Sequence, residues 1–258
     1  MNVVILCGGL GTRIREETEF RPKPMVNIGP RPILWHIMKL YAYHGFNDFI
    51  LALGYKGEMI RDYFCHYELM NNDITVRLGH PESTIVHNGH EEAGWKVLLA
   101  NTGETALKGA RLKRIEKYID GESFMMTYGD GLSNVNIPAL LEFHKYHGKI
   151  ATVTGINPPL RFGRLQLDGS KIIGFKEKPN ETDGFVNGGF FVFDRKVFSY
   201  LSSHDSCDLE NGPLQALAAD GELMVFHHKG FWSCMDTLND MNNLNKLWAD
   251  GNAQWKTW

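Results

Sequence analysis

A short apolar segment that leads directly into a glycine-rich loop is the feature that most constrains how this chain can fold. The segment Val3-Val4-Ile5-Leu6-Cys7 is an unbroken apolar run, which is typical of a strand in a parallel sheet covered on both faces. The loop Gly8-Gly9-Leu10-Gly11-Thr12-Arg13 follows at once. Because ligands of open α/β sheets bind beyond the carboxyl ends of the strands, the start of the chain predicts an α/β fold with a site at this loop.

The loop has the chemistry of a phosphate-binding turn. Gly8, Gly9 and Gly11 carry no Cβ atoms, so backbone N–H groups can turn toward a phosphate and surround it. Thr12 adds a hydroxyl group. The loop lacks the Gly-Lys-Ser/Thr of a Walker A motif and the third glycine of the dinucleotide fingerprint, which disfavours a kinase or a dehydrogenase. It therefore predicts a nucleoside triphosphate site of another kind.

Two cations accompany the loop. Arg13 presents a planar fork that matches phosphate oxygens, and Lys23 supplies a compact charge from the proline-bracketed segment Arg21-Pro22-Lys23-Pro24-Met25. We expect both side chains to stabilise a leaving pyrophosphate as catalytic groups. A glycine-rich turn with ordinary surface cations is the alternative. The attached Thr-Arg and Pro-Lys-Pro sequences favour the phosphate site.

Charge and cysteine content limit the partners and the compartment. The 258 residues carry 27 basic and 30 acidic side chains, a formal charge of −3, so no basic excess indicates nucleic acid or a membrane surface. The four cysteines are far apart and form no C-x-x-C pair, which predicts free thiols in a reducing compartment. No secretory signal or apolar stretch long enough to span a membrane is visible. We expect a cytoplasmic protein.

Alternating helical and strand patterns predict a doubly wound sheet in the first part of the chain. We expect strands at 49–53, 74–78, 123–128 and 151–154 and helices at 32–41, 57–67 and 137–147, with a loop or extended excursion at 79–94. Past Gly163 the stretches are short and alternating, as in an antiparallel or mixed sheet. Asp236 to Trp248 has the spacing of a closing helix. The predicted fold class is α/β, a Rossmann-like doubly wound, mixed but mainly parallel sheet with a small β-rich extension.

Two aspartates are candidates for a metal site. Asp130 and Asp236 each follow an apolar run, and a hard cation such as Mg²⁺ is held by one or two carboxylates together with phosphate oxygens and water. A turn or helix-cap role is the alternative for either residue. Gly129 and Gly131 on both sides of Asp130 leave room for a ligand, which favours the metal site there.

The remaining charged groups have two interpretations each. Lys178, in Glu177-Lys178-Pro179, is either a surface ion-pair partner or a pocket cation for a second phosphate. The basic cluster Arg111, Lys113 and Arg114 by itself predicts a solvated helix face. No nucleophile with a matched base is visible. This favours direct attack of one phosphate on another, which needs positioning and charge neutralisation rather than a covalent intermediate.

Together these motifs resemble the sugar-1-phosphate nucleotidyltransferase family, over the whole length of the chain. The motifs are the loop with Pro-Lys-Pro-Met, Tyr128-Gly129-Asp130, Glu177-Lys178-Pro179, Asn187-Gly188-Gly189 and Asp236. More narrowly, several segments resemble the cytidylyl-transferring branch of that family. They are Arg15-Glu16-Glu17-Thr18, Pro32-Ile33-Leu34-Trp35-His36-Ile37-Met38, Gly54-Tyr55-Lys56-Gly57, Arg111-Leu112-Lys113-Arg114, Arg161-Phe162-Gly163, Gly230-Phe231-Trp232, Met235-Asp236-Thr237-Leu238 and Trp255-Lys256-Thr257-Trp258.

The resemblance assigns expected roles to individual residues. The expected nucleotide-binding residues are Leu6, Gly8, Gly9, Gly11, Thr12, Arg13, Lys23, Thr105, Gly109, Arg111 and Gly129. The expected sugar-phosphate-binding residues are Gly163, Glu177, Lys178, Asn187 and Gly188. Asp130 and Asp236 match the Mg²⁺ pair. We expect one domain over residues 1–258, with a nucleotide-binding half at about 1–150, a sugar-phosphate-binding half at about 151–235 and a helical segment at about 236–258.

The implied reaction joins CTP and α-D-glucose 1-phosphate to give CDP-glucose and pyrophosphate, an entry step to deoxysugars of surface polysaccharide. The alternatives are a uridylyl- or thymidylyltransferase, a cytidylyltransferase for another sugar phosphate, or a catalytically silent nucleotide-sugar regulatory protein. The resemblance also implies a homo-oligomer. The chain departs from the family pattern at Ala110, Pro30 and Gly212, where the family usually has glycine, glycine and an acidic residue. Of these, Ala110 lies in the expected nucleotide region.

Overall fold

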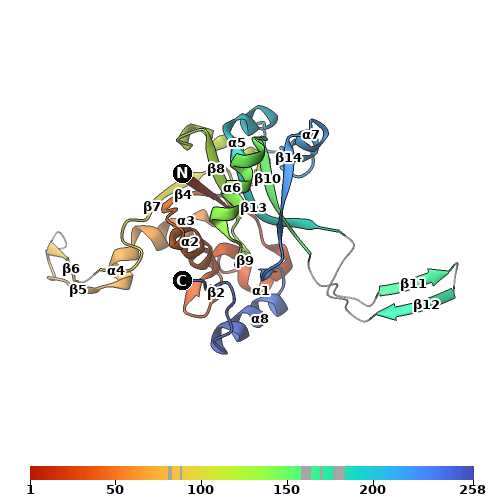
Figure 1. Ribbon diagram of the computed structural model, residues 1–258. Coiled ribbons are helices and arrows are strands. Elements are labelled where there is room, and N and C mark those ends of the chain that lie inside the picture. The colour runs from red at the N-terminus through yellow and green to blue at the C-terminus, as the bar shows by residue number, and fades with distance from the viewer. Residues whose placement is uncertain (81–82, 88, 158–163, 169–170, 177–183) are drawn as a thin grey trace.

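A seven-stranded sheet forms the centre of the protein in the computed structural model, which describes residues 1–80, 83–87, 89–157, 164–168, 171–176 and 184–258 (Figure 1). The strands lie in the order β14-β10-β13-β8-β1-β4-β7. Their bounds are β1 (Asn2–Cys7), β4 (Asp48–Leu53), β7 (Lys96–Asn101), β8 (Ser123–Tyr128), β10 (Ala151–Ile156), β13 (Val186–Asp194) and β14 (Leu223–His228). All neighbouring pairs are parallel except the two that involve β13. The predicted mixed, mainly parallel α/β sheet is confirmed.

Helices cover both faces of the sheet, as the unbroken apolar run of β1 predicts. Val3 and Ile5 of β1 pack in one buried cluster with residues of α2 and α6. Val4 and Leu6 pack on the other face with residues of α5 and α7. The helices are α1 (Arg15–Thr18), α2 (Ile33–Tyr43), α3 (Gly57–Cys65), α4 (Tyr67–Asn71), α5 (Lys108–Arg114), α6 (Ile137–His147), α7 (Pro213–Ala219) and α8 (Leu238–Ala249), with 3₁₀ turns η1 (Thr12–Ile14), η2 (Lys23–Met25), η4 (Glu116–Tyr118) and η5 (Arg195–Tyr200). Among the described helices, none has both the length and the apolar composition that crossing a membrane requires.

The prediction of a central strand at 74–78 is wrong. That segment contributes β5 (Asp73–Thr75), which among the described strands pairs with β6 (Ile85–His87) alone, in a separate hairpin. The central position beside β4 belongs instead to β7, whose run Val97-Leu98-Leu99-Ala100 is apolar on both faces. A segment with polar residues at alternate positions cannot be buried on both sides, which explains the difference. The helix expected at 57–67 also divides into α3 and α4 at His66.

The later part of the chain supplies the antiparallel elements. The hairpin β11 (Arg164–Asp168) and β12 (Lys171–Lys176) extends away from the central sheet (Figure 1). Strand β13 inserts antiparallel between β10 and β8. The change to an antiparallel or mixed pattern is therefore confirmed, although β13 joins the main sheet rather than an extension. Two short ladders complete the described strands, β2 (Asn27–Ile28) with β3 (Arg31–Pro32) and β9 (Gly131–Ser133) with β15 (Trp232–Cys234).

The closing helix begins at Leu238, two residues later than Asp236. Thr237 ends the extended segment with a capping box, because its hydroxyl accepts a hydrogen bond from the Asp240 N–H at 3.2 Å. The Asp240 carboxylate in turn accepts from the Thr237 N–H at 2.9 Å. Such a box fixes the first turn of a helix. Asp236 therefore lies outside the helix.

Candidate active site

A pocket of about 510 Å³ lies at the carboxyl ends of β1 and β8 and contains most of the predicted site residues. The predicted residues in its lining are Leu6, Gly8, Gly9, Gly11, Thr12, Arg13, Lys23, Arg111, Gly129, Asp130, Asn187 and Asp236. A second cavity of about 560 Å³, near Trp35 and Trp258, contains none of them. The pocket at the strand ends is therefore the candidate active site.

Thr18 packs against Gly11 and helps to fix the loop that opens the pocket. Gly11 has a φ of +63°, and a Cβ atom there would lie 2.5 Å from the Thr18 Cγ2. The Thr18 hydroxyl donates to the Gly11 carbonyl oxygen at 3.0 Å. Gly9 differs, because a Cβ atom there would have no protein atom within 4 Å. Its missing side chain leaves open space in the pocket.

Arg111 is buried behind the loop and holds it by a hydrogen bond to the Gly8 carbonyl oxygen. Its guanidinium makes five hydrogen bonds of 2.6 to 3.1 Å and is only 3% exposed. The acceptors are the carbonyl oxygens of Gly8, Leu53, Gly103 and Glu104 and the hydroxyl of Thr102. Three loops at the strand ends thus share one cation. The expectation of a solvated helix face is wrong at Arg111, because α5 turns this side chain inward.

The two aspartates come together through a short antiparallel ladder. Asp130 directly precedes β9, and Asp236 follows β15 by two residues. Gly131 is opposite Cys234 in that ladder, and the Met235 N–H donates to the Asp130 carbonyl oxygen at 2.9 Å. This pairing joins two segments that lie far apart in the sequence. It explains how an aspartate near the chain's end reaches the end of β8.

Lys23 lies between these carboxylates. Its ammonium nitrogen is 2.6 Å from Asp130 Oδ2 and 2.7 Å from Asp236 Oδ1. Burial by itself lowers the pKa of Lys23, but the Asp130 charge and hydrogen bonds to both carboxylates outweigh it and raise that pKa. Arg13 reaches the other oxygen, with its Nη1 2.8 Å from Asp236 Oδ2. Both predicted catalytic cations therefore contact Asp236.

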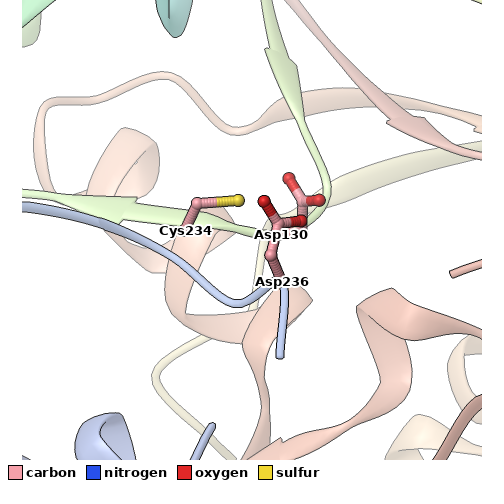
Figure 2. A group of neighbouring side chains, drawn as sticks. All are labelled: Asp130, Cys234 and Asp236. Atoms are coloured by element: carbon pink, nitrogen blue, oxygen red, sulfur yellow. The ribbon is translucent and has the colours of Figure 1, made fainter. Parts of the chain in front are cut away.

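The carboxylate pair fits a divalent cation. Burial raises the pKa of Asp236, yet the hydrogen bond and charge of Lys23 and the charge of Arg13 lower it overall, so the group is ionised at neutral pH. Ligand atoms of Asp130, Cys234 and Asp236 all lie within 4.8 Å of one another (Figure 2). Carboxylate oxygens are the ligands that a hard divalent cation prefers. Lys23 already shows that a positive charge is stable between them.

A hydrogen-bonded network forms the far wall. The Tyr128 hydroxyl donates to Glu210 Oε1 at 2.7 Å and accepts from the Asn187 side-chain amide at 3.1 Å. The Lys108 ammonium lies 4.9 Å from the centre of the Tyr128 ring. Trp232 donates from its indole nitrogen to the Gly188 carbonyl oxygen at 2.7 Å. This network fixes the side chain of Asn187 at the pocket.

Some predicted residues lie elsewhere. Thr105 is exposed, and its hydroxyl donates to Asp205 at 2.8 Å. Gly109 packs against the 207–209 segment, where a Cβ atom would lie 2.7 Å from the Cys207 sulfur. Gly188 does not line the pocket surface but holds Trp232. Gly163, Glu177 and Lys178 lie outside the residues that the structure describes.

Several residues that line the pocket are not among those predicted from the sequence. They are Cys7, Pro24, Ala106, Leu107, Lys108, Tyr128, Trp232 and Cys234. A signal existed for two of them, because residues 232, 234 and 236 alternate in an extended segment and so share one face. Lys108 and Leu107 gave no such signal, since only the packing of α5 brings them to the pocket.

Comparison with known proteins identifies the family of the chain. The family profile described as "Nucleotidyl transferase" matches residues 2–250. The chain is 48% identical over 259 residues, covering all of both chains, to a glucose-1-phosphate cytidylyltransferase of Salmonella typhi. Among solved structures it is similar to the inositol-1-phosphate CTP transferase from T. maritima, with a TM-score of 0.64, 18% identity and coverage of 96% and 94% of the two chains. It is also similar to HddC from Yersinia pseudotuberculosis, with a TM-score of 0.66, 22% identity and coverage of 96% and 99%.

Proposed function

Because the chain belongs to the nucleotidyl transferase family, we propose that it transfers a cytidylyl group from CTP to α-D-glucose 1-phosphate, releasing pyrophosphate and forming CDP-glucose. The observation that carries this proposal is the pocket itself, where the glycine loop, Lys23 and the two aspartates meet. The choice of base and sugar follows the 48% identity over full length to a relative with that name.

The reaction is a single displacement at phosphorus. A phosphate oxygen of glucose 1-phosphate attacks the α-phosphorus of CTP, a new P–O bond forms, and the bond to pyrophosphate breaks. Two anions must approach, so the protein's main tasks are alignment and charge neutralisation. Backbone N–H groups of the loop and the Arg13 guanidinium would hold the triphosphate. Lys23 would stabilise the charge that develops on the leaving group.

Mg²⁺ is our proposal for the divalent cation, held by Asp130 and Asp236. When bound, it would neutralise phosphate charge and raise the electrophilicity of the α-phosphorus. Lys23 and Arg13, which contact these carboxylates, would then be available to phosphate oxygens. The proposal for the sugar phosphate side includes Asn187, fixed by Tyr128, and keeps Gly163, Glu177, Lys178 and Gly188 as predicted contacts.

A substrate panel tests the proposal. Pure protein is incubated with Mg²⁺, one of CTP, UTP, dTTP, ATP or GTP, and glucose 1-phosphate, and pyrophosphate release is measured. We expect the highest kcat/KM with CTP. No release with CTP would refute the proposal, and faster release with UTP or dTTP would support the alternative base. Repeating the CTP reaction with other hexose 1-phosphates and inositol phosphate tests the sugar.

Assembly and location are part of the same proposal. We propose a homo-oligomeric enzyme of the cytoplasm, folded as one domain with the two substrate-binding halves described above. Exposed apolar side chains on α4 and on the β5–β6 hairpin, such as Met70 at 79% and Ile85 at 55% exposure, support a contact between copies. Light scattering at several concentrations gives the mass, and a monomer throughout would contradict the oligomer.

A silent regulatory role is the second candidate and is disfavoured. A protein that only bound nucleotide sugar would not need both cations and both carboxylates. Arg13, Lys23, Asp130 and Asp236 are all present, with Lys23 in contact with both carboxylates and Arg13 in contact with Asp236.

A further inference from the structure

Cys234 places a thiol beside the carboxylate pair, and the proposed reaction gives it no role. It is the last residue of β15 and lies opposite Gly131 in the ladder that aligns the two aspartates. Its sulfur and one oxygen of each carboxylate lie within 4.8 Å of one another (Figure 2). The three side chains come from the two strands at one end of this ladder, so backbone hydrogen bonds between the strands set their spacing.

Mixed oxygen and sulfur donors suit a different cation from the one the reaction uses. Mg²⁺ takes oxygen ligands, whereas Zn²⁺ and Cd²⁺ accept thiolate together with carboxylate. We propose that Asp130, Cys234 and Asp236 form a site for a thiophilic divalent cation, Zn²⁺ or Cd²⁺, which competes with the hard cation for the carboxylates. The site would make the enzyme sensitive to these metals.

The position of Lys23 supports a cation at this point. Its ammonium contacts both carboxylates at 2.6 and 2.7 Å and so occupies the place of a positive ion. The carboxylates are 24% and 19% exposed and, like Cys234, line the pocket, so a cation can reach them from solvent. A divalent ion that binds there must displace the Lys23 ammonium from the carboxylates. The displaced side chain stays protonated and moves toward the open pocket.

The binding step balances without a redox partner. The sulfur–metal bond forms as the S–H bond breaks, and the proton passes to solvent. Two carboxylates and one thiolate then face one divalent ion. Sulfur remains at the same oxidation level throughout, and no other reactant is required. The proposal concerns the same pocket as the transfer reaction but does not depend on which nucleotide it uses.

Cadmium alone is the probe for the experiment. The full chain is titrated with Cd²⁺ without nucleotide, and the ultraviolet charge-transfer absorption of a cadmium–thiolate bond is recorded. We expect the absorption in wild-type protein and its loss in Cys234→Ser, with Cd²⁺ affinity lowered at least about tenfold. Cys207→Ser is the matched control, because this partly buried thiol lies outside the pocket and should leave the signal unchanged. An undiminished signal in Cys234→Ser would overturn the proposal.

Two further variants test the geometry. Asp236→Asn removes one ligand and should lower Cd²⁺ affinity at least about tenfold. Lys23→Met removes the internal cation and should raise it, which a merely structural lysine would not do. Excess Mg²⁺ should weaken apparent Cd²⁺ binding. Cadmium affinity that is unchanged in Asp236→Asn, reduced in Lys23→Met, or insensitive to Mg²⁺ would contradict the site. The readout involves no turnover, so its failure would leave the proposed transfer reaction intact.

Discussion

Gly8 and Gly9 are adjacent glycines with different predicted effects when a methyl group is added. A Cβ atom at Gly8 would lie 2.2 Å from the Arg111 Cζ, whereas at Gly9 it would meet nothing within 4 Å. An arginine end is usually flexible, but this one is fixed by five hydrogen bonds. Gly8→Ala must therefore break some of them, while Gly9→Ala only fills pocket space.

The magnitudes follow from the contacts. A hydrogen bond to a charged group contributes about 1.5 to 3 kcal/mol, so losing one or two at Arg111 lowers the free energy of unfolding by about 3 kcal/mol. For a chain of this size that corresponds to a fall in Tm of roughly 6 to 12 °C. Gly9→Ala should change stability by less than about 1 kcal/mol, with a small gain from the less flexible unfolded chain. Its kcat/KM with CTP should nevertheless fall at least about tenfold, about 1.4 kcal/mol, because the methyl group occupies phosphate space.

Calorimetry and pyrophosphate release measure these two effects separately. Gly54→Ala provides a second approach to Arg111, since its Cβ atom would lie 2.2 Å from the Arg111 Nη1. If both substitutions act by displacing the Arg111 guanidinium, the stability loss of the double variant should be smaller than the sum of the two single losses. In an Arg111→Met background, neither substitution should lower Tm by much. An unchanged Tm in Gly8→Ala would refute the support role of Arg111. A wild-type kcat/KM in Gly9→Ala would refute the phosphate-binding role of the loop.

Three further predictions concern the carboxylates, the far wall and acid stability. Asp130→Asn and Asp236→Asn should each lower kcat at least about tenfold with an unchanged circular dichroism spectrum; wild-type rates in both would contradict the metal pair. Tyr128→Phe removes the hydroxyl that fixes Asn187 and should raise KM for glucose 1-phosphate more than KM for CTP in steady-state kinetics. Burial lowers the pKa of His36 to about 4, against about 6.5 unfolded. Between these pH values the unfolded chain therefore binds more protons than the folded chain, and the free energy of unfolding should fall by about 3 kcal/mol from pH 7 to pH 4. Urea titrations at several pH values measure this fall. It should be smaller in His36→Gln.

The first strand, its loop and the alternation of helices and strands could be predicted because local signals suffice for them. The run Val3 to Cys7 has no polar residue, and Pro32 and Gly45 bracket the helix that follows. Local signals do not suffice for the segment 74–78. The alternating apolar and polar residues of this segment fit a central strand and also a hairpin with β6 outside the central sheet. The hairpin forms because β7 takes the place beside β4.

The residues that would bind phosphate and metal were more predictable from the sequence than the residues that hold the loops of the site in place. Phosphate-binding and metal-binding groups are recognisable by type, so Arg13, Lys23 and both aspartates could be chosen from sequence. Arg111 shows the limit, because its burial results from the inward face of α5 and from carbonyl oxygens of three loops. Backbone acceptors have no sequence signature. Cys234 is a similar case, because only the ladder with β9 brings it near Asp130.

The stereochemistry at the α-phosphorus distinguishes direct transfer from a route through a covalent enzyme intermediate. Cys7 and Cys234 both line the pocket and are its candidate nucleophiles for a covalent route. Burial raises the pKa of both thiols, and the nearby Asp130 carboxylate adds to this effect, so they stay protonated at neutral pH and are weak nucleophiles. With α-thio-CTP of one configuration and glucose 1-phosphate, a single displacement predicts CDP-glucose with inverted configuration at the α-phosphorus. Retention would require two displacements through a cytidylyl-enzyme and would contradict direct transfer.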